Sequence, residues 1–305
     1  MEDAAVECHD ESGDHPSVER TSPTVCVCVA FTIGKGLVAG ASVFGLGSLC
    51  FYGMGLSREV GAYERSLLWP EYVKTRIRDT YAYFGMSILA VAGSAAAAVR
   101  NPTIMRFAMS NSIGVTLGTM AALVALSAVT HSIPYTEGFG AKQCAWLAHC
   151  GLVGTILAPL SYLGGPILLK AGLYTAGICG GLSLLAVCAP SEKYLSMGGP
   201  LAIGLGVVFA SCMGEFPFLV VGSIFLPAHL AHTSLGAGLH SIILYGGLVL
   251  FSGYLLYDTQ RTIADAEKQR HYDPIDHSIS IYMSVINIFI RMVMILADGN
   301  SKKRR

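Results

Sequence analysis

Eight long apolar segments, separated by short polar ones, dominate the chain. Each has close to the roughly 20 residues that an α-helix needs to cross a hydrocarbon core of about 30 Å. The segments lie at about 35–56, 80–99, 107–130, 145–164, 170–189, 198–221, 237–257 and 279–297. Because the connecting segments are short, the pattern predicts one all-α bundle, a polytopic membrane protein of about eight transmembrane helices.

Residues that break or cap helices fall between the apolar segments. Arg100-Asn101-Pro102 separates the second segment from the third, and Gly164-Gly165-Pro166 separates the fourth from the fifth. Asp273-Pro274 supplies a stop before the last segment, and Asp276 or Ser278 supplies an N-cap. We therefore expect Asp273 and Asp276 to act in helix capping.

The polar residues divide the chain into three parts. Residues 1–34 are acidic at their start, contain no Arg-rich transit peptide, and are predicted to be disordered. Residues 35–298 form the predicted transmembrane bundle, and residues 299–305 form a basic C-terminal tail. Basic residues divide almost evenly between the two faces of the bundle, so the positive-inside rule does not fix its orientation.

Composition agrees with a protein in lipid. The chain is 53% hydrophobic and 13% charged, about half the charge of a soluble protein, and its mean hydropathy is +0.56. A net charge of zero argues against nucleic acid as a partner. The nine cysteines lie mostly alone in apolar segments, which favours neither a disulfide framework nor a zinc site. We find no nucleotide-binding loop, nucleophile elbow or zinc-protease motif, so we expect no enzymatic activity and no cofactor.

Asp258 stands out because it follows an apolar segment directly. An Asp at membrane depth costs roughly 2.5–3.5 kcal/mol, whereas each Leu, Ile, Val or Phe returns about 0.3–0.6 kcal/mol, so this carboxylate would cancel about five to ten apolar residues. Two interpretations stay open. Asp258 lies at the membrane interface with Tyr257 and Arg261, or it is a titrating carboxylate in an aqueous cavity that exchanges a proton for a metal ion.

The other candidates in apolar surroundings carry less weight. Glu215 lies between Gly214 and Pro217, which favours a loop. His229 and His232 have the spacing of a metal-binding helix face but lack a third ligand in the sequence, which favours an interfacial pair. Arg291 needs an anionic or carbonyl partner at membrane depth unless its side chain extends to the lipid interface.

Several long stretches resemble one known family. They are WPEYVKTRIRDTY (69–81), HSIPY (131–135), LGGPILLKAGLYTAGICGGLS (163–183), CAPSEKYLSMGGPL (188–201), YGGLVLFSGYLLYDTQ (245–260), YDPI (272–275) and SIYMSVINIFIRM (280–292). On these stretches the chain, from about Gly36 to Arg305, resembles the transmembrane Bax inhibitor motif family, and within it a mitochondrial inner-membrane branch.

The resemblance implies a seven-helix family bundle plus one N-terminal helix. It also implies the movement of cations, as Ca²⁺/H⁺ or K⁺/H⁺ exchange, and roles in mitochondrial calcium homeostasis, cristae organisation and the control of apoptosis. Cytochrome c and inner-membrane proteases are the implied partners, and the inner mitochondrial membrane is the implied location. In the family, two aspartates on the last two helices form a pH-sensitive latch over the pore, and Asp258 matches the first of them.

The chain departs from the family in three places. Ser284 stands where the second latch aspartate is expected, and a hydroxyl cannot share a titrating proton with Asp258. Ca²⁺ prefers about six to eight oxygens, so a missing carboxylate weakens a cation site and predicts altered pH dependence or lower transport. Residues 215–222 look like additional sequence, and the acidic N-terminus replaces the presequence of a mitochondrial import.

Two hypotheses follow. The first is a cation/proton exchanger or leak pathway of the inner mitochondrial membrane, with Asp258, Ser284 and Arg291 on the ion and proton pathway and Asp258 as the metal ligand. The second is a structural or interaction protein that organises cristae and binds partners without transport.

Overall fold

The structure is a computed structural model, and it describes residues 69–110, 113–136, 138–189, 193–207 and 242–303, with a few single residues between 36 and 48. Every regular element within these ranges is helical, as an all-α membrane bundle requires. Several predictions lie outside the described residues: the disordered segment 1–34, most of the first predicted helix, Glu215 and segment 215–222, His229, His232 and the end of the basic tail.

The helices follow one another with few intervening residues. They are α3 (Glu71–Arg100), α4 (Pro102–Ala108), α5 (Ile113–Ser132), α6 (Ala141–Leu157), η1 (Ala158–Leu163), α7 (Gly165–Cys188), η2 (Lys193–Met197), η3 (Ile242–Gly246), α10 (Gly247–Lys268) and α11 (Pro274–Lys303). Four stretches in the described part are long and apolar enough to cross a membrane, namely Glu71–Arg100, Ala141–Leu163, Gly165–Cys188 and Pro274–Ala297. The total of eight stays a prediction.

The predicted breaks lie at the observed helix ends. The Asn101 side chain accepts a hydrogen bond from the Thr103 amide at 3.0 Å, and Pro102 begins α4. Gly164 has φ +98°, a left-handed conformation that glycine adopts without strain, and it ends η1 just before α7. Asp273 Oδ1 accepts the amides of Ile275 at 3.0 Å and Asp276 at 3.3 Å, so Asp273 caps α11. The N-cap predicted at Asp276 or Ser278 is wrong, because α11 already begins at Pro274 and both residues lie inside it.

Helix α10 corrects the predicted boundary near Asp258. The apolar pattern ends at about residue 257, but α10 continues to Lys268. Thr259, Ile263 and Ala266 in this extension are buried, because its inner face packs against the bundle while its outer face is polar. Asp258 therefore lies inside a helix rather than at its end.

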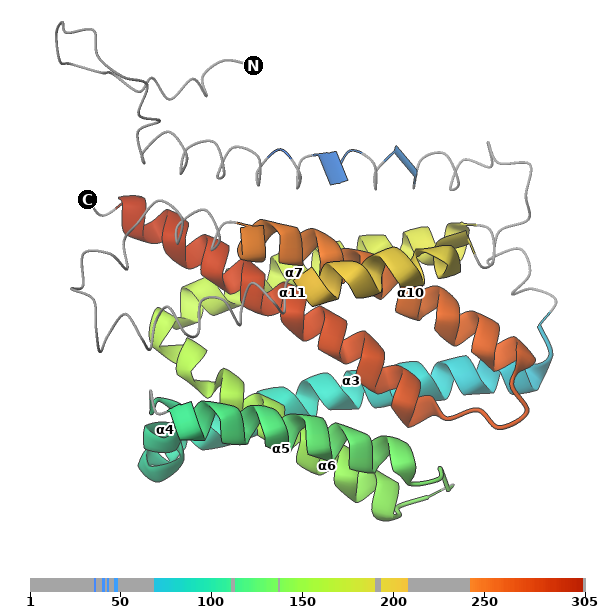
Figure 1. Cartoon of the computed structure of the whole chain (residues 1–305), viewed down its shortest axis with the longest axis horizontal. Helices are drawn as coiled ribbons and strands as arrows, with labels where there is room; N and C mark the ends of the chain where they lie inside the picture. The colour runs from blue at the N-terminus through green and yellow to red at the C-terminus, as the bar shows by residue number, and fades with distance from the viewer. Residues whose placement is uncertain are drawn as a thin grey trace, which may run out of the picture.

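Helix α11 occupies the middle of the bundle. It crosses the molecule diagonally, with α3, α5 and α6 on one side and α7 and α10 on the other (Figure 1). We call the end that holds the start of α6 and of α11 the Lys142 end, and the end that holds α4, η1 and the start of α7 the Arg100 end.

The core between α3, α6 and α11 is closely packed. Val91, Trp146, Cys150 and Tyr282 are buried together there. A Cβ atom on Gly154 would lie 1.9 Å from Ser94 Oγ, so α3 and α6 approach one another backbone to backbone at this point. The outer faces instead expose large apolar side chains, as helices surrounded by lipid do.

Candidate functional site

Asp258 and Ser284 meet between α10 and α11. The Ser284 hydroxyl donates a hydrogen bond to Asp258 Oδ2 at 3.0 Å, and the two residues are only 7% and 5% exposed. They are 26 positions apart in sequence, and the turn between the helices brings them together. The structure thus joins two of the three residues proposed for the ion and proton pathway.

The two residues after Asp258 are buried and hydrogen-bonded, and the second of them joins α10 to its neighbours. Thr259 is buried, and its hydroxyl donates to the Leu255 carbonyl at 2.7 Å. The Gln260 side chain accepts the Tyr194 amide at 2.7 Å and donates to the Ala186 carbonyl at 3.3 Å. Asp258 and Gln260 therefore connect α10 to α11, to η2 and to the end of α7.

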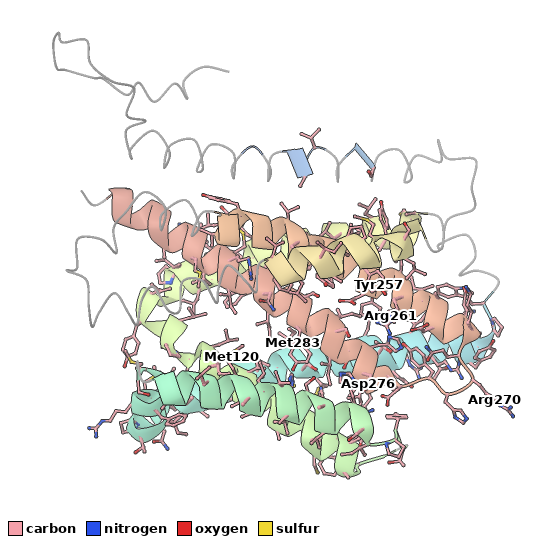
Figure 2. The ribbon with its side chains drawn as sticks, viewed as in Figure 1. Met120, Tyr257, Arg261, Arg270, Asp276 and Met283 are labelled. Carbon is pink, nitrogen blue, oxygen red and sulfur yellow. The ribbon has the colours of Figure 1, made fainter. Side chains whose placement is uncertain are left out.

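Arg261 forms its ion pair with Asp265 rather than with Asp258. Its side chain is 53% exposed, and its Nε atom lies 3.5 Å from Asp265 Oδ2, one turn further along α10. Tyr257 and Arg261 can both be located on α10 in Figure 2. Asp258 is buried inside α10, so the part of the interfacial interpretation that put it at a helix end is wrong, and its depth in the membrane stays a prediction.

Arg291 lies two helical turns from Ser284 on α11, a rise of about 10 Å. Its Nη1 atom donates to the Asn287 carbonyl at 3.1 Å and to Asn287 Oδ1 at 3.2 Å. The guanidinium lies 4.6 Å from the centre of the Phe251 ring, and it occupies the space where Gly247 lacks a side chain. Arg291 therefore has the carbonyl partner that its position requires, but it takes no part in the Asp258–Ser284 hydrogen bond.

The site supplies few ligands for a metal. Among the residues that the structure describes, no group of three or more His, Cys, Asp and Glu side chains could hold a metal ion. Asp258 and Ser284 together offer three oxygen atoms, fewer than the roughly six to eight that Ca²⁺ prefers. A cation that passes Asp258 would therefore keep much of its hydration shell.

A second charged cluster, at the Lys142 end, was missed in the sequence. Lys142 is 1% exposed and contacts Asp273 Oδ2, and its Nζ atom lies 2.8 Å from Asp276 Oδ1. His131 Nδ1 lies 3.1 Å from the same Asp276 oxygen. The sequence pattern predicts helix capping for Asp273 and Asp276, but their i, i+3 spacing at the start of α11 also brings both carboxylates to Lys142, a signal for a shared partner.

The loop between α10 and α11 is fixed by aromatic and cationic contacts. The Thr80 and Tyr272 hydroxyls lie 2.6 Å apart, and the Tyr272 ring stacks on His277 with ring centres 4.8 Å apart. Burial raises the pKa of Tyr272, so its phenol stays protonated near neutral pH. Arg76 Nη1 donates to the carbonyls of Ala266 and Gln269 at 2.9 and 2.8 Å. These contacts set the register of the two helices that carry Asp258 and Ser284.

Comparison with known proteins identifies relatives of this chain by sequence. Residues 73–301 match the family Bax1-I, described as inhibitor of apoptosis-promoting Bax1. The chain is 48% identical over 278 residues to the growth hormone-inducible transmembrane protein of Rattus norvegicus, an alignment that covers 89% of this chain and 77% of the relative. It is 31% identical over 196 residues to Bax inhibitor 1 of Homo sapiens, covering 62% and 73% of the two chains.

These matches confirm the resemblance inferred from the sequence stretches. The family match extends over most of the chain, from the start of α3 to the end of α11, and so includes Asp258 and Ser284. The chain therefore belongs to the Bax1-I family, as a multi-pass membrane protein.

Proposed function

We propose that this chain moves cations against protons across the inner mitochondrial membrane, as an exchanger or a leak pathway. The observation that carries the proposal is the buried Asp258 carboxyl, which receives a hydrogen bond from Ser284 across the α10–α11 contact. A carboxylate is costly inside a membrane bundle, and such residues commonly lie on ion or proton pathways. Ca²⁺ or K⁺ would be the transported ion, and no cofactor or enzymatic reaction is involved.

In this mechanism Asp258 binds and releases the proton. When Asp258 is ionised, Ser284 donates a charge-assisted hydrogen bond to it, which is stronger than a neutral one. Protonation neutralises the acceptor and weakens this contact between α10 and α11. Proton binding at Asp258 is thereby coupled to the spacing of α10 and α11. One carboxylate acts here, whereas the family resemblance implies a pair of aspartates.

Arg291 limits where a cation can rest. It adds a fixed positive charge about 10 Å along α11 from Ser284. Repulsion from this guanidinium favours a cation at Asp258 over one near Asn287. We therefore place Asp258 as the binding residue, Ser284 as its hydrogen-bond donor, and Arg291 as the positive end of the pathway.

The wider cellular role of the chain rests on its relatives. The names of the matched relatives connect the family with inhibition of Bax, which supports a contribution to the control of apoptosis. The similarity to the growth hormone-inducible transmembrane protein, together with the resemblance to the mitochondrial branch, supports the inner-membrane location. We extend the proposal to mitochondrial calcium homeostasis and cristae organisation, with cytochrome c and inner-membrane proteases as partners.

A second function is favoured by one specific observation. Asp258 is satisfied by a neutral hydroxyl, and Gln260, two residues further along α10, joins this helix to η2 and to the end of α7. A protein that organises cristae and binds partners without transport also fits this arrangement, with Asp258 as a helix-joining residue.

Ion flux in proteoliposomes tests the two functions. Purified protein is reconstituted with a pH-sensitive dye inside, and Ca²⁺ or K⁺ gradients are applied to the native chain, Asp258→Asn and Ser284→Asp. Asp258→Asn keeps the size of the side chain and can still accept the Ser284 hydrogen bond. The transport proposal predicts proton-coupled flux in the native chain and its loss in Asp258→Asn.

The other outcomes are equally informative. Flux that appears only in Ser284→Asp would mean that two carboxylates are required and that the native chain is not a transporter. The absence of flux in all three proteins, each folded to the same degree by circular dichroism, would leave the structural function as the better proposal.

A further inference from the structure

Polar side chains recur along one line of helix α11, inside its apolar stretch Pro274–Ala297. They stand at spacings of three, four, three and four residues, and they are His277, Ser280, Ser284, Asn287 and Arg291. Because an α-helix has about 3.6 residues per turn, these spacings place all five on one face. The line extends over about 21 Å of the roughly 30 Å that a hydrocarbon core measures. Polar residues inside a membrane span are costly and commonly mark the paths of ions.

Two carboxylates of α10 meet this line one above the other. The Ser284 hydroxyl donates to Asp258 Oδ2 at 3.0 Å. Nearer the loop between the helices, His277 Nε2 lies 3.6 Å from Asp265 Oδ2. The two contacts are about 10 Å apart, since they are separated by two turns on each helix. We call this row the polar seam, formed by the five residues of α11 together with Asp258, Thr262 and Asp265.

Thr262 lies between the two carboxylates, one turn from each of them on α10. Its side chain is only 1% exposed, yet its hydroxyl makes no hydrogen bond with any residue that the structure describes. The nearby Thr259 hydroxyl, by contrast, donates to the Leu255 carbonyl. A buried hydroxyl without a protein partner is unfavourable, so such a group indicates contact with water or an ion. Thr262 therefore offers an oxygen to a hydrated cation that moves between Asp258 and Asp265.

Asp265 lies where the seam reaches the Lys142 end. It is three residues before Lys268, the last residue of α10, and its side chain is 21% exposed. The Arg261 Nε atom lies 3.5 Å from Asp265 Oδ2, and the Arg261 side chain is 53% exposed. Water screens an ion pair in this position, so Arg261 is held only weakly. Its guanidinium is thus a tethered cation that a cation from solution can replace at the same carboxylate.

We propose that cations enter the protein from the Lys142 end along the polar seam, with Asp265 as the outer carboxylate and Arg261 as its competing cation. From Asp265 the cation passes the Thr262 hydroxyl and reaches Asp258. Arg291 stands at the other end of the seam, and its positive charge opposes movement of a cation beyond Asp258. The inference rests on the proposed transport function and adds the side from which the cation arrives.

Initial rates of Ca²⁺ or K⁺ flux in proteoliposomes test the role of Asp265. In Asp265→Asn, the half-saturating cation concentration should rise roughly fivefold with little change in the maximal rate, because the carboxylate attracts the cation before it reaches Asp258. Asp265→Glu should restore the native value. In Arg261→Gln, the half-saturating concentration should fall by up to roughly fivefold, because the competing cation is removed. Glu71→Gln is the matched control, since Glu71 is an exposed carboxylate at the same end but outside the seam.

Thiol labelling tests the seam independently of transport. In the full chain with its nine native cysteines replaced by alanine or serine, Ser280→Cys and Asn287→Cys receive a charged methanethiosulfonate reagent. Both should react, because the reagent arrives through water and attacks a thiolate. Val285→Cys is the matched control, since Val285 is half-buried on the same helix but lines the apolar pocket between α3 and α7. It should react roughly tenfold more slowly, because apolar surroundings suppress the thiolate.

The outcomes separate the seam from the transport function. Native flux that is lost in Asp258→Asn, with an unchanged half-saturating concentration in Asp265→Asn, would overturn the entry route and leave the transport function in place. Seam thiols that react as slowly as Val285→Cys would overturn the route as well, because they would not meet water. The absence of flux in the native chain would overturn the transport function and the entry route together.

Discussion

Lys142 is a buried cation whose partners are two partly exposed carboxylates. Its side chain is 1% exposed, against 22% for Asp273 and 29% for Asp276. Lys142→Met keeps the apolar stem but leaves the two acids facing one another without the Lys142 ammonium group. Removing one partner of a buried ion pair costs about 3–5 kcal/mol, and we expect a loss near the lower value because the acids retain some water. Denaturant unfolding in detergent micelles measures this loss.

Lys74→Met is the control for this prediction. The Lys74 and Glu71 side chains lie 3.1 Å apart but are 45% and 88% exposed, so their ion pair contributes only about 0–1 kcal/mol. Equal effects of the two lysine substitutions would show that the Lys142 cluster is no more important than a surface ion pair.

Sequence reasoning found Asp258 but not Lys142, and their positions explain why. Asp258 follows an unbroken apolar run, so its cost in lipid is visible without any structure. Lys142 lies at the start of an apolar segment, where a lysine ordinarily reaches water. Its burial depends on residues more than 130 positions away on α11. The Ser284 partner was found through resemblance, because nothing in the local pattern connects it with Asp258.

At the scale of elements, the hydropathy of the sequence predicts where a membrane helix lies better than it predicts the residues at which that helix begins and ends. The breaks near Asn101 and Gly164 were recognised because these residue types have backbone preferences of their own. The last part of α10 was missed because it is rich in polar and charged residues, which lower its hydropathy without ending the helix, although most of its residues are buried against the bundle. The order of packing around α11 could not be predicted, because similar apolar faces allow many neighbours.

The close approach of α3 and α6 gives a prediction for one pair of helices. Gly154→Ala places a Cβ atom 1.9 Å from Ser94 Oγ and 2.4 Å from the Val91 carbonyl oxygen. Since a backbone atom is involved, the helices must move apart, and we expect a loss of about 1–3 kcal/mol in unfolding free energy. The midpoint of thermal unfolding should fall accordingly.

Gly151→Ala is the matched control on the same helix. A Cβ atom there would meet nothing within 4 Å, and alanine favours a helix over glycine by up to about 1 kcal/mol. This variant should unfold at the same temperature as the native chain or higher. A similar loss in both variants would indicate a general effect of substitution in α6 rather than a close contact with α3.

At the scale of the whole molecule, the described helices place two sets of residues at opposite ends of the bundle. The end of α3, α4 and the start of α7 share the Arg100 end, whereas the start of α6 and the loop between α10 and α11 share the Lys142 end (Figure 1). Each of the four long apolar stretches is 23 residues or more, enough at about 1.5 Å per residue to cross the hydrocarbon core. The two ends should therefore face different compartments.

Single-cysteine labelling in sealed vesicles tests this arrangement. In a chain whose native cysteines are replaced by serine or alanine, an impermeant maleimide should reach Asn101→Cys and Lys170→Cys from one side of the membrane. It should reach Gly138→Cys and Arg270→Cys only from the other side. Labelling of Asn101→Cys and Arg270→Cys from the same side would contradict a crossing by α3.

The same experiment decides between seven and eight spans. Helix α3 begins at the Lys142 end, so an additional helix at 35–56 returns the N-terminal segment to the Arg100 end. With eight spans, Arg20→Cys is labelled from the same side as Asn101→Cys; with seven, it is labelled from the side of Arg270→Cys. Labelling after permeabilisation is the control, because every position should then react. If the maleimide labels Arg20→Cys from the same side as Arg270→Cys, the segment at 35–56 does not cross the membrane. The bundle then has the seven helices implied by the family resemblance.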